Sequence, residues 1–153
     1  MIVIKRILIG LGVLFVAVIV LFSCVGESAR AFRKEQEPFV QSFVWQLSKH
    51  WNIAYLDDDL STGTVRQRLR STGGQQALLQ MKPLGVFRSA RDFELLSYNT
   101  GTEGSTGTFS FKAIFEYGDA TVRVTVTERD RNSRVSGLTI TDIHVEHTSN
   151  TET

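Results

Sequence analysis

Hydrophobic residues recur at helical spacing in the segment that follows Pro38. One face of such a helix would carry Phe39, Val40, Phe43, Val44, Leu47, Trp51 and Ala54, and the opposite face Gln41, Ser48, Lys49 and Asn52. Because proline suits the first turn of a helix, we expect a new amphipathic helix of about 18 residues to begin at Pro38. Trp45 falls outside the apolar face, so we expect it either to be an exposed partner contact or to be covered by a loop.

An uninterrupted apolar run precedes this pattern. Residues 7–22 contain only Ile, Leu, Val, Phe, Ala and Gly, and no charged residue occurs between residues 7 and 26. At about 1.5 Å rise per residue, these 20 positions span roughly 30 Å, the thickness of a bilayer's hydrocarbon core. We therefore predict a membrane anchor over residues 1–26 that contacts the lipid bilayer through residues 7–26. The charged residues 27–37 are predicted to extend this helix or to form a short helical stalk.

The single cysteine of the chain, Cys24, lies at the end of the apolar run. The sequence Leu21-Phe22-Ser23-Cys24 resembles the bacterial lipobox, which makes Cys24 a lipidation candidate. Phe22 is bulkier than that motif usually accepts, and a spanning helix explains the length of the run better, so we favour an uncleaved anchor over a lipoprotein. Lys5 and Arg6 precede the run, as in an export signal, whereas Arg30, Arg33 and Lys34 follow it and by the positive-inside rule favour the opposite orientation. We give the export signal more weight. We therefore expect a membrane-anchored domain that faces the periplasm or the cell exterior, with the bacterial inner membrane favoured.

Shorter helical patterns follow the long helix. Residues 57–62 are predicted to form a loop that caps a short helix, and Gly73 with Gly74 is predicted to end that helix. Residues 75–81 predict one or two further helical turns, which Pro83 stops.

The hydrophobic period changes from helical to alternating after Leu84 and Gly85. The positions predicted to face the core are Phe93, Leu95, Ser97, Phe109, Phe111, Ala113, Phe115, Val122, Val124 and Val126. Residues 99–107 are rich in glycine and predict a long, mobile connection between two strands. Gly118 and Asp119 predict a tight turn, and residues 128–134 predict another.

The last predicted strand, residues 135–146, changes phase partway. Leu138 and Ile140 share one face of the strand, whereas Ile143 and Val145 share the opposite face. A β-bulge near Thr141 and Asp142 would turn both pairs inward. The predicted fold class is therefore α+β, with the long helix and the short helices packed on a curved antiparallel sheet of about four strands. This domain covers residues 38–147, and residues 148–153 are predicted to be a disordered tail.

The long leading helix, the "KPLGVF" break at residues 82–87 and the meander "FSFKAIFEYGDATVRVTVTERDRNSRVSGLTI" resemble the nuclear-transport-factor-like (cystatin-like) α+β roll. The resemblance covers roughly residues 39–145 and implies a curved sheet wrapped on one helix. The anchor followed by this domain is also similar, more weakly, to type IV secretion assembly factors and cytochrome oxidase assembly factors. Catalytic members of the superfamily place an Asp or His between helix and sheet. Here the inward strand positions are apolar, so we expect no enzyme and no cofactor.

Charge and histidine placement exclude further classes. Lys5 and Arg6 are the only charged residues before residue 27, so the rest of the chain carries 15 basic and 16 acidic residues. A nucleic-acid-binding domain would need a clustered basic surplus, so no nucleic-acid partner is expected. His50, His144 and His147 cannot converge in the predicted elements, and we expect no metal site.

A basic cluster is the most informative remaining feature. It contains Arg66, Arg68, Arg70, Lys82, Arg88 and Arg91, of which Arg66 and Arg70 share a helical face. The cluster could meet anionic lipid or an acidic partner, or the acidic residues 57–59 could neutralise it. The predicted function is that of a non-catalytic interaction or assembly domain with a protein partner in the cell envelope. The alternative is a carrier of a small apolar ligand in the cone between helix and sheet, with Trp51, Tyr55, Phe87 and Tyr98 as its lining.

Overall fold

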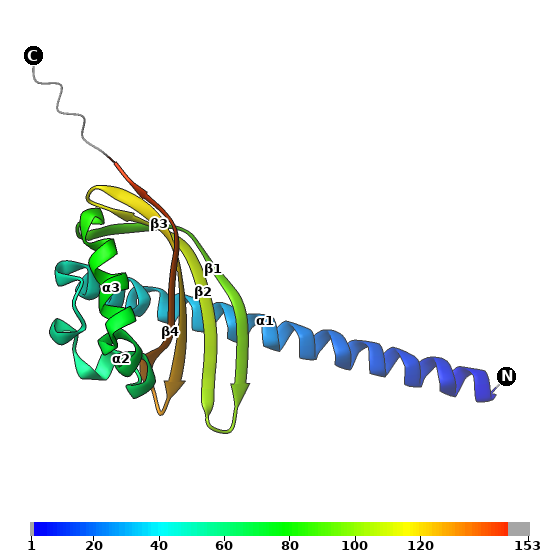
Figure 1. The fold of residues 1–153 in the computed structure, drawn as a ribbon. Helices are drawn as coiled ribbons and strands as arrows, with labels where there is room; N and C mark the ends of the chain where they lie inside the picture. The colour runs from blue at the N-terminus through cyan, green and yellow to red at the C-terminus, as the bar shows by residue number, and fades with distance from the viewer. Residues whose placement is uncertain (1, 147–153) are drawn as a thin grey trace, which may run out of the picture. The chain divides into compact units, whose positions relative to one another are not determined.

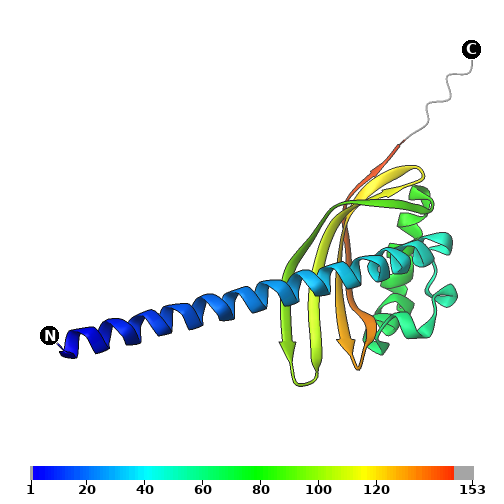
Figure 2. The same cartoon turned by 180° about the vertical axis from the view of Figure 1, so that it is seen from behind.

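Helices come first in this chain and an antiparallel sheet follows them (Figures 1 and 2). The computed structural model describes the backbone of residues 2–146 and the side chains of residues 26–146. The helices are α1 (Ile2–His50), α2 (Gly63–Arg70) and α3 (Thr72–Met81), and the strands are β1 (Phe87–Gly101), β2 (Gly104–Phe115), β3 (Gly118–Arg129) and β4 (Asn132–Val145). The predicted α+β class and the four antiparallel strands are confirmed.

Helix α1 passes through Pro38 without interruption, so the prediction that a new helix begins there is wrong. Pro38 has no N–H to donate to the carbonyl of Lys34, one turn earlier. Both residues are exposed, so water can satisfy that carbonyl, and the charged residues on either side are good helix formers. The chain divides into two compact units, Met1–Glu35 and Gln36–Thr153.

The apolar run at the start of α1 lies almost wholly outside the residues whose side chains are described. From residue 26 to residue 146, no helix contains a segment both long enough and apolar enough to cross a bilayer. The predicted anchor over residues 7–26, apart from Gly26, and the lipidation candidate Cys24 lie outside this range.

The C-terminal part of α1 buries the predicted apolar face. Val40, Phe43, Val44 and Leu47 are all buried. The helix ends at His50, and Trp51 follows with a left-handed backbone (φ 47°).

Two positions near the end of α1 differ from the prediction. Ala54 lies beyond the helix and is exposed, and Ile53 is buried instead, because the left-handed Trp51 changes the direction of the chain. Ser48, expected on the polar face, is only 1% exposed. Its hydroxyl donates to the carbonyl of Trp45 at 3.0 Å and accepts from the backbone N–H of Phe87 at 2.8 Å.

Ser71, not the pair of glycines, separates α2 from α3. Its backbone N–H closes the last turn of α2, and its hydroxyl accepts from the N–H of Gly74 at 3.2 Å to cap α3. Gly73 and Gly74 therefore lie in the first turn of α3, which corrects the predicted helix end. A Cβ atom at Gly74 would overlap the carbonyl oxygen of Arg68, so glycine allows the close approach of the two helices. Helix α3 passes into a 3₁₀ turn, Lys82–Leu84, that contains Pro83, as predicted.

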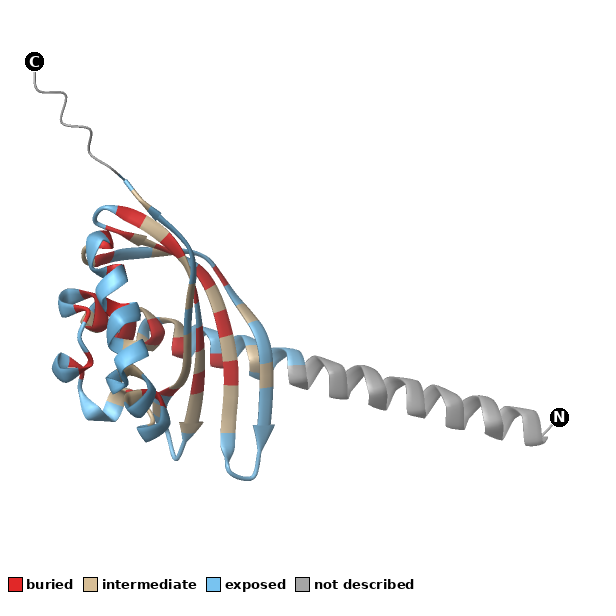
Figure 3. Ribbon diagram, in the orientation of Figure 1, coloured by how far each residue is buried: buried red, intermediate tan, exposed pale blue. Residues whose placement is uncertain are grey.

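The four strands form a meander in the order β1-β2-β3-β4. Phe109, Phe111, Ala113 and Phe115 of β2 and Val122, Val124 and Val126 of β3 are buried, as the alternation predicts (Figure 3). Phe93 of β1 is buried against the rings of Phe109 and Phe111, each with a centroid distance of 5.2 Å. Leu95 is only half-buried and Ser97 is exposed, because register shifts at residues 91–94 and 95–97 interrupt the alternation of β1.

The hairpin connections are shorter than predicted. Only Thr102 and Glu103 connect β1 to β2, so residues 99–107 are mostly strand and not a long loop. The hydroxyl of Ser105 donates to that of its β1 partner Thr100 at 3.1 Å, and such cross-strand hydroxyl pairs favour extension of the ladder toward the turn.

The other two turns are also displaced or shortened. The turn between β2 and β3 is formed by Glu116 and Tyr117, because Gly118 already pairs with Val145 in the sheet. Asp130 and Arg131, both left-handed (φ 52° and 63°), form the turn between β3 and β4. The predicted turn over residues 128–134 is therefore mostly paired strand.

The predicted bulge in β4 is present at Asp142, whose φ is 49°. The register shifts by one residue there, between the pairs Thr121–Thr141 and Asp119–His144. Val145 then lies opposite Gly118 and is half-buried, but Ile143 is 38% exposed and does not enter the core as predicted. The physical reason is that Ile143 lies within the bulge itself, where neither Asp142 nor Ile143 has a partner in the ladder with β3.

The helices of the second unit cover one face of the sheet. Trp51 packs on Phe115 with a centroid distance of 5.5 Å. Leu78 and Met81 of α3 line a small apolar cavity with Leu138 and Ile140 of β4, whose sheet partners Val124 and Val122 are buried. Within residues 36–146, no helix lies over the opposite face of the sheet (Figures 1 and 2).

Candidate functional site

Two of the four residues predicted to line a ligand cavity are part of the core. Trp51 and Phe87 are buried, and both pack on Phe115, with Phe87 at a centroid distance of 6.0 Å. The indole N–H of Trp51 donates to the carbonyl of Gly85 at 3.0 Å. The two aromatic side chains therefore join the end of α1 to the start of the sheet.

The other two predicted lining residues lie elsewhere. Tyr55 is 65% exposed and stacks on His50, with 4.2 Å between the ring centroids. Tyr98 is half-buried on β1, near the hairpin end of the strand. The four residues do not surround a common cavity, because Tyr55 is separated from the core by the turn that follows Trp51.

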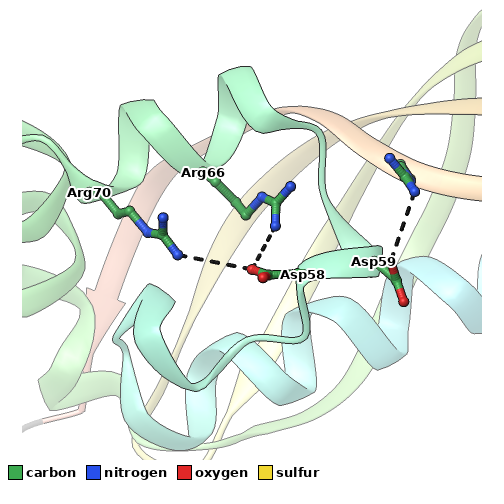
Figure 4. A network of polar contacts seen from close by, with 5 residues as sticks. Asp58, Asp59, Arg66 and Arg70 are labelled. Carbon is green, nitrogen blue, oxygen red and sulfur yellow. Dashed lines mark ion pairs between the residues drawn. The ribbon is translucent and has the colours of Figure 1, made fainter.

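Acidic neighbours pair with three of the six residues of the predicted basic cluster, and Figure 4 shows two of them, Arg66 and Arg70. Asp58 lies 2.6 Å from the guanidinium of Arg66 and 3.9 Å from that of Arg70, so both arginines share one face of α2 as predicted. Arg88 pairs with Glu116 at 3.0 Å. Arg68, Lys82 and Arg91 form no ion pair within residues 26–146, so both interpretations of the cluster stay predictions.

Trp45 is exposed on the free side of α1, as its position outside the apolar face predicts. It is 42% exposed, and the ammonium group of Lys49 lies 3.5 Å from its ring centroid, one helical turn away. The same side of the helix carries Ser42 and Gln41, so the tryptophan lies among polar groups. Tryptophan is enriched among the residues that dominate binding at protein interfaces.

The interior of the sheet offers no group for acid–base chemistry. The buried side chains of β2 and β3 are phenylalanine, valine and alanine. Within residues 26–146, no three His, Cys, Asp or Glu side chains are close enough to hold a metal ion together. Of the three histidines, His147 lies outside the described residues.

Two depressions at the hairpin end of the sheet were not predicted from the sequence. The larger, of about 640 Å³, is lined by residues 100–105 with Arg129 and Asp130. The smaller, of about 320 Å³, is lined by Thr62, Thr127, Arg129, Asp130, Asn132 and Arg134. The segment "ERDRNSR" predicts only a turn, and its proximity to Thr62 depends on the bond from the N–H of Thr62 to the carbonyl of Val135.

No protein-family model, curated protein or solved structure matches this chain. The likeness to the nuclear-transport-factor-like roll therefore stays a prediction.

Proposed function

We propose that this chain is a membrane-anchored, non-catalytic interaction domain that faces the periplasm or the cell exterior and binds a protein partner in the cell envelope. The exposed Trp45 on the free side of α1 carries the proposal. Tryptophan has a large apolar surface and is enriched among the residues that dominate binding energy. We further propose that the domain is a roll of the nuclear-transport-factor-like type, because a long helix crosses one face of a curved meander.

The predicted anchor supports the location. Twenty uncharged residues precede the domain, and the positions from Gln36 onward already belong to its compact unit. A domain tethered so closely to a bilayer meets partners that share the same membrane. Tethering raises their effective concentration, so a small contact surface around one tryptophan suffices.

Site-specific photo-crosslinking in native membranes tests the proposal. A photoreactive residue at Ser42, exposed about one turn before Trp45, is compared with one at Arg123, exposed on the outer face of the sheet. We expect the Ser42 probe, but not the Arg123 probe, to give one discrete adduct, identified by mass spectrometry. The variant Trp45→Ala should remove that adduct. Recovery of monomer alone from the Ser42 probe, or an adduct that survives Trp45→Ala, would contradict the proposed function.

A further inference from the structure

The smaller depression at the hairpin end collects groups that bind an anion. Its lining residues include two arginines, Arg129 and Arg134, together with Asn132, Thr62 and Thr127; the hydroxyl of Thr127 already donates to that of Ser136 at 3.0 Å. Guanidinium groups bind carboxylate and phosphate oxygens through paired, charge-assisted hydrogen bonds. We refer to these residues, together with Asp130, as the Arg129 site.

The two arginines are available to a ligand. Within residues 26–146, Arg129 forms no ion pair with an acidic side chain. Arg134 has one, to Asp59 at 3.8 Å, and that carboxylate is 97% exposed. An ion pair so open to water contributes little, so an incoming anion can replace it. This distinguishes the site from Arg66, whose guanidinium lies 2.6 Å from Asp58.

Backbone contacts hold the walls of the site in place. Ser61 forms a parallel bridge with Val135, and the N–H of Thr62 donates to the carbonyl of Val135 at 2.9 Å. These bonds fix the start of α2 beside β4. The hydroxyl of Thr62 caps α2 by accepting from the N–H of Val65 at 3.4 Å, so the positive end of that helix lies at the rim. Such preorganisation lowers the ordering cost of binding.

One carboxylate belongs to the lining. Asp130 is adjacent in sequence to Arg129, and it has a left-handed backbone in the tight turn between β3 and β4. A simple anion would be repelled by this carboxylate, whereas a ligand with an ammonium group next to its anionic group would meet both charges. From this arrangement we propose that the Arg129 site binds a small zwitterion that joins a phosphate or carboxylate to a primary amine. A volume of about 320 Å³ suits a ligand of this size.

Calorimetric titration of the full chain in a non-ionic detergent tests the site. The probes are O-phosphoethanolamine and inorganic phosphate. We expect O-phosphoethanolamine to bind more tightly, and Arg129→Gln or Arg134→Gln to weaken it about tenfold each, the loss typical of one charge-assisted hydrogen bond. Asp130→Asn should reduce the preference for O-phosphoethanolamine over phosphate. Arg123→Gln, an exposed arginine of β3 outside the lining, is the matched control and should have no effect.

Two outcomes would overturn the inference: no binding of either probe at millimolar concentration, or equal weakening by Arg123→Gln and Arg129→Gln. Circular dichroism of each variant separates a loss of binding from a loss of folding. The phosphoethanolamine group occurs both as a soluble metabolite and as a lipid headgroup, and nanodiscs distinguish these sources. If the site binds the lipid headgroup, phosphatidylethanolamine in the disc competes with added O-phosphoethanolamine, which then binds more weakly than in phosphatidylcholine discs. Equal binding of O-phosphoethanolamine in the two kinds of disc assigns the site to a soluble ligand. Neither result bears on the crosslinking at Ser42.

Discussion

Replacing Ser48 by alanine should destabilise the domain far more than a typical serine substitution on a helix. The hydroxyl is the hydrogen-bond acceptor for the backbone N–H of Phe87, at 2.8 Å, in a place where Ser48 is 1% exposed and Phe87 is buried. Without the hydroxyl, that N–H has no acceptor, because water cannot reach this buried position. Leaving a buried donor unsatisfied costs about 1–3 kcal/mol. The carbonyl of Trp45, which accepts from the same hydroxyl at 3.0 Å, keeps its bond within the helix and adds little.

Urea denaturation of the full chain in detergent, followed by tryptophan fluorescence, measures this loss. We expect Ser48→Ala to lower the free energy of unfolding by about 2 kcal/mol. Ser42→Ala, on the exposed side of the same helix, should change it by less than about 0.5 kcal/mol. Hydrogen exchange at the Phe87 amide should also become faster in Ser48→Ala. If Ser48→Ala and Ser42→Ala unfold at the same urea concentration, the buried hydrogen bond does not stabilise the domain as argued.

Three further substitutions test other parts of the structure. Gly85→Ala should destabilise the domain by more than about 1 kcal/mol in the same assay, because Gly85 has a φ of 75° and an added Cβ would lie 2.9 Å from two side-chain atoms. Gly63→Ala, with open space around its Cβ position, is the control and should be neutral or stabilising. Arg66→Gln should cost less than about 1 kcal/mol, and the difference should shrink in high salt, because its partner Asp58 is exposed; a salt-independent loss would contradict a surface ion pair. Cys24→Ala should leave the intact mass of the membrane-extracted protein at full length, as in the wild type; a wild-type mass lowered by residues 1–23 and raised by lipid, and restored in the variant, would show lipobox processing instead.

The sheet was largely predictable because one of its faces packs against the core and the other faces water. Phe109 and Phe111 alternate with polar residues, and a one-residue error in the predicted face would place every one of them in water. The bulge at Asp142 was predictable for the same reason, since the apolar phase changes there. The exposure of Ile143 was not predictable, because it depends on which residues of the bulge lose their partners in β3, and no local pattern records that.

Positions whose partners are distant in the sequence could not be predicted. Ser48 reads as polar and therefore exposed, but the group that it satisfies, the N–H of Phe87, is 39 residues away. Pro38 reads as a helix start, but the helix on both sides continues through it. The Arg129 site likewise exists only because Thr62 is bonded beside β4. The local propensity of a residue does not record which distant residues it contacts, and tertiary contacts override that propensity.

The contact between α1 and β3 has a consequence for synthesis of the chain. Gln36, 1% exposed, donates to the carboxylate of Glu128 at 2.6 Å, and the two residues are 92 positions apart. At roughly 5–20 residues per second, a ribosome needs about 5–20 s to make the intervening segment. In the later part of that interval Val40, Phe43 and Leu47 have emerged from the ribosome, but β3 is not yet complete and β4 has not been made. The apolar face of the nascent helix therefore needs to be bound by a chaperone or by the membrane surface until the sheet has been synthesised.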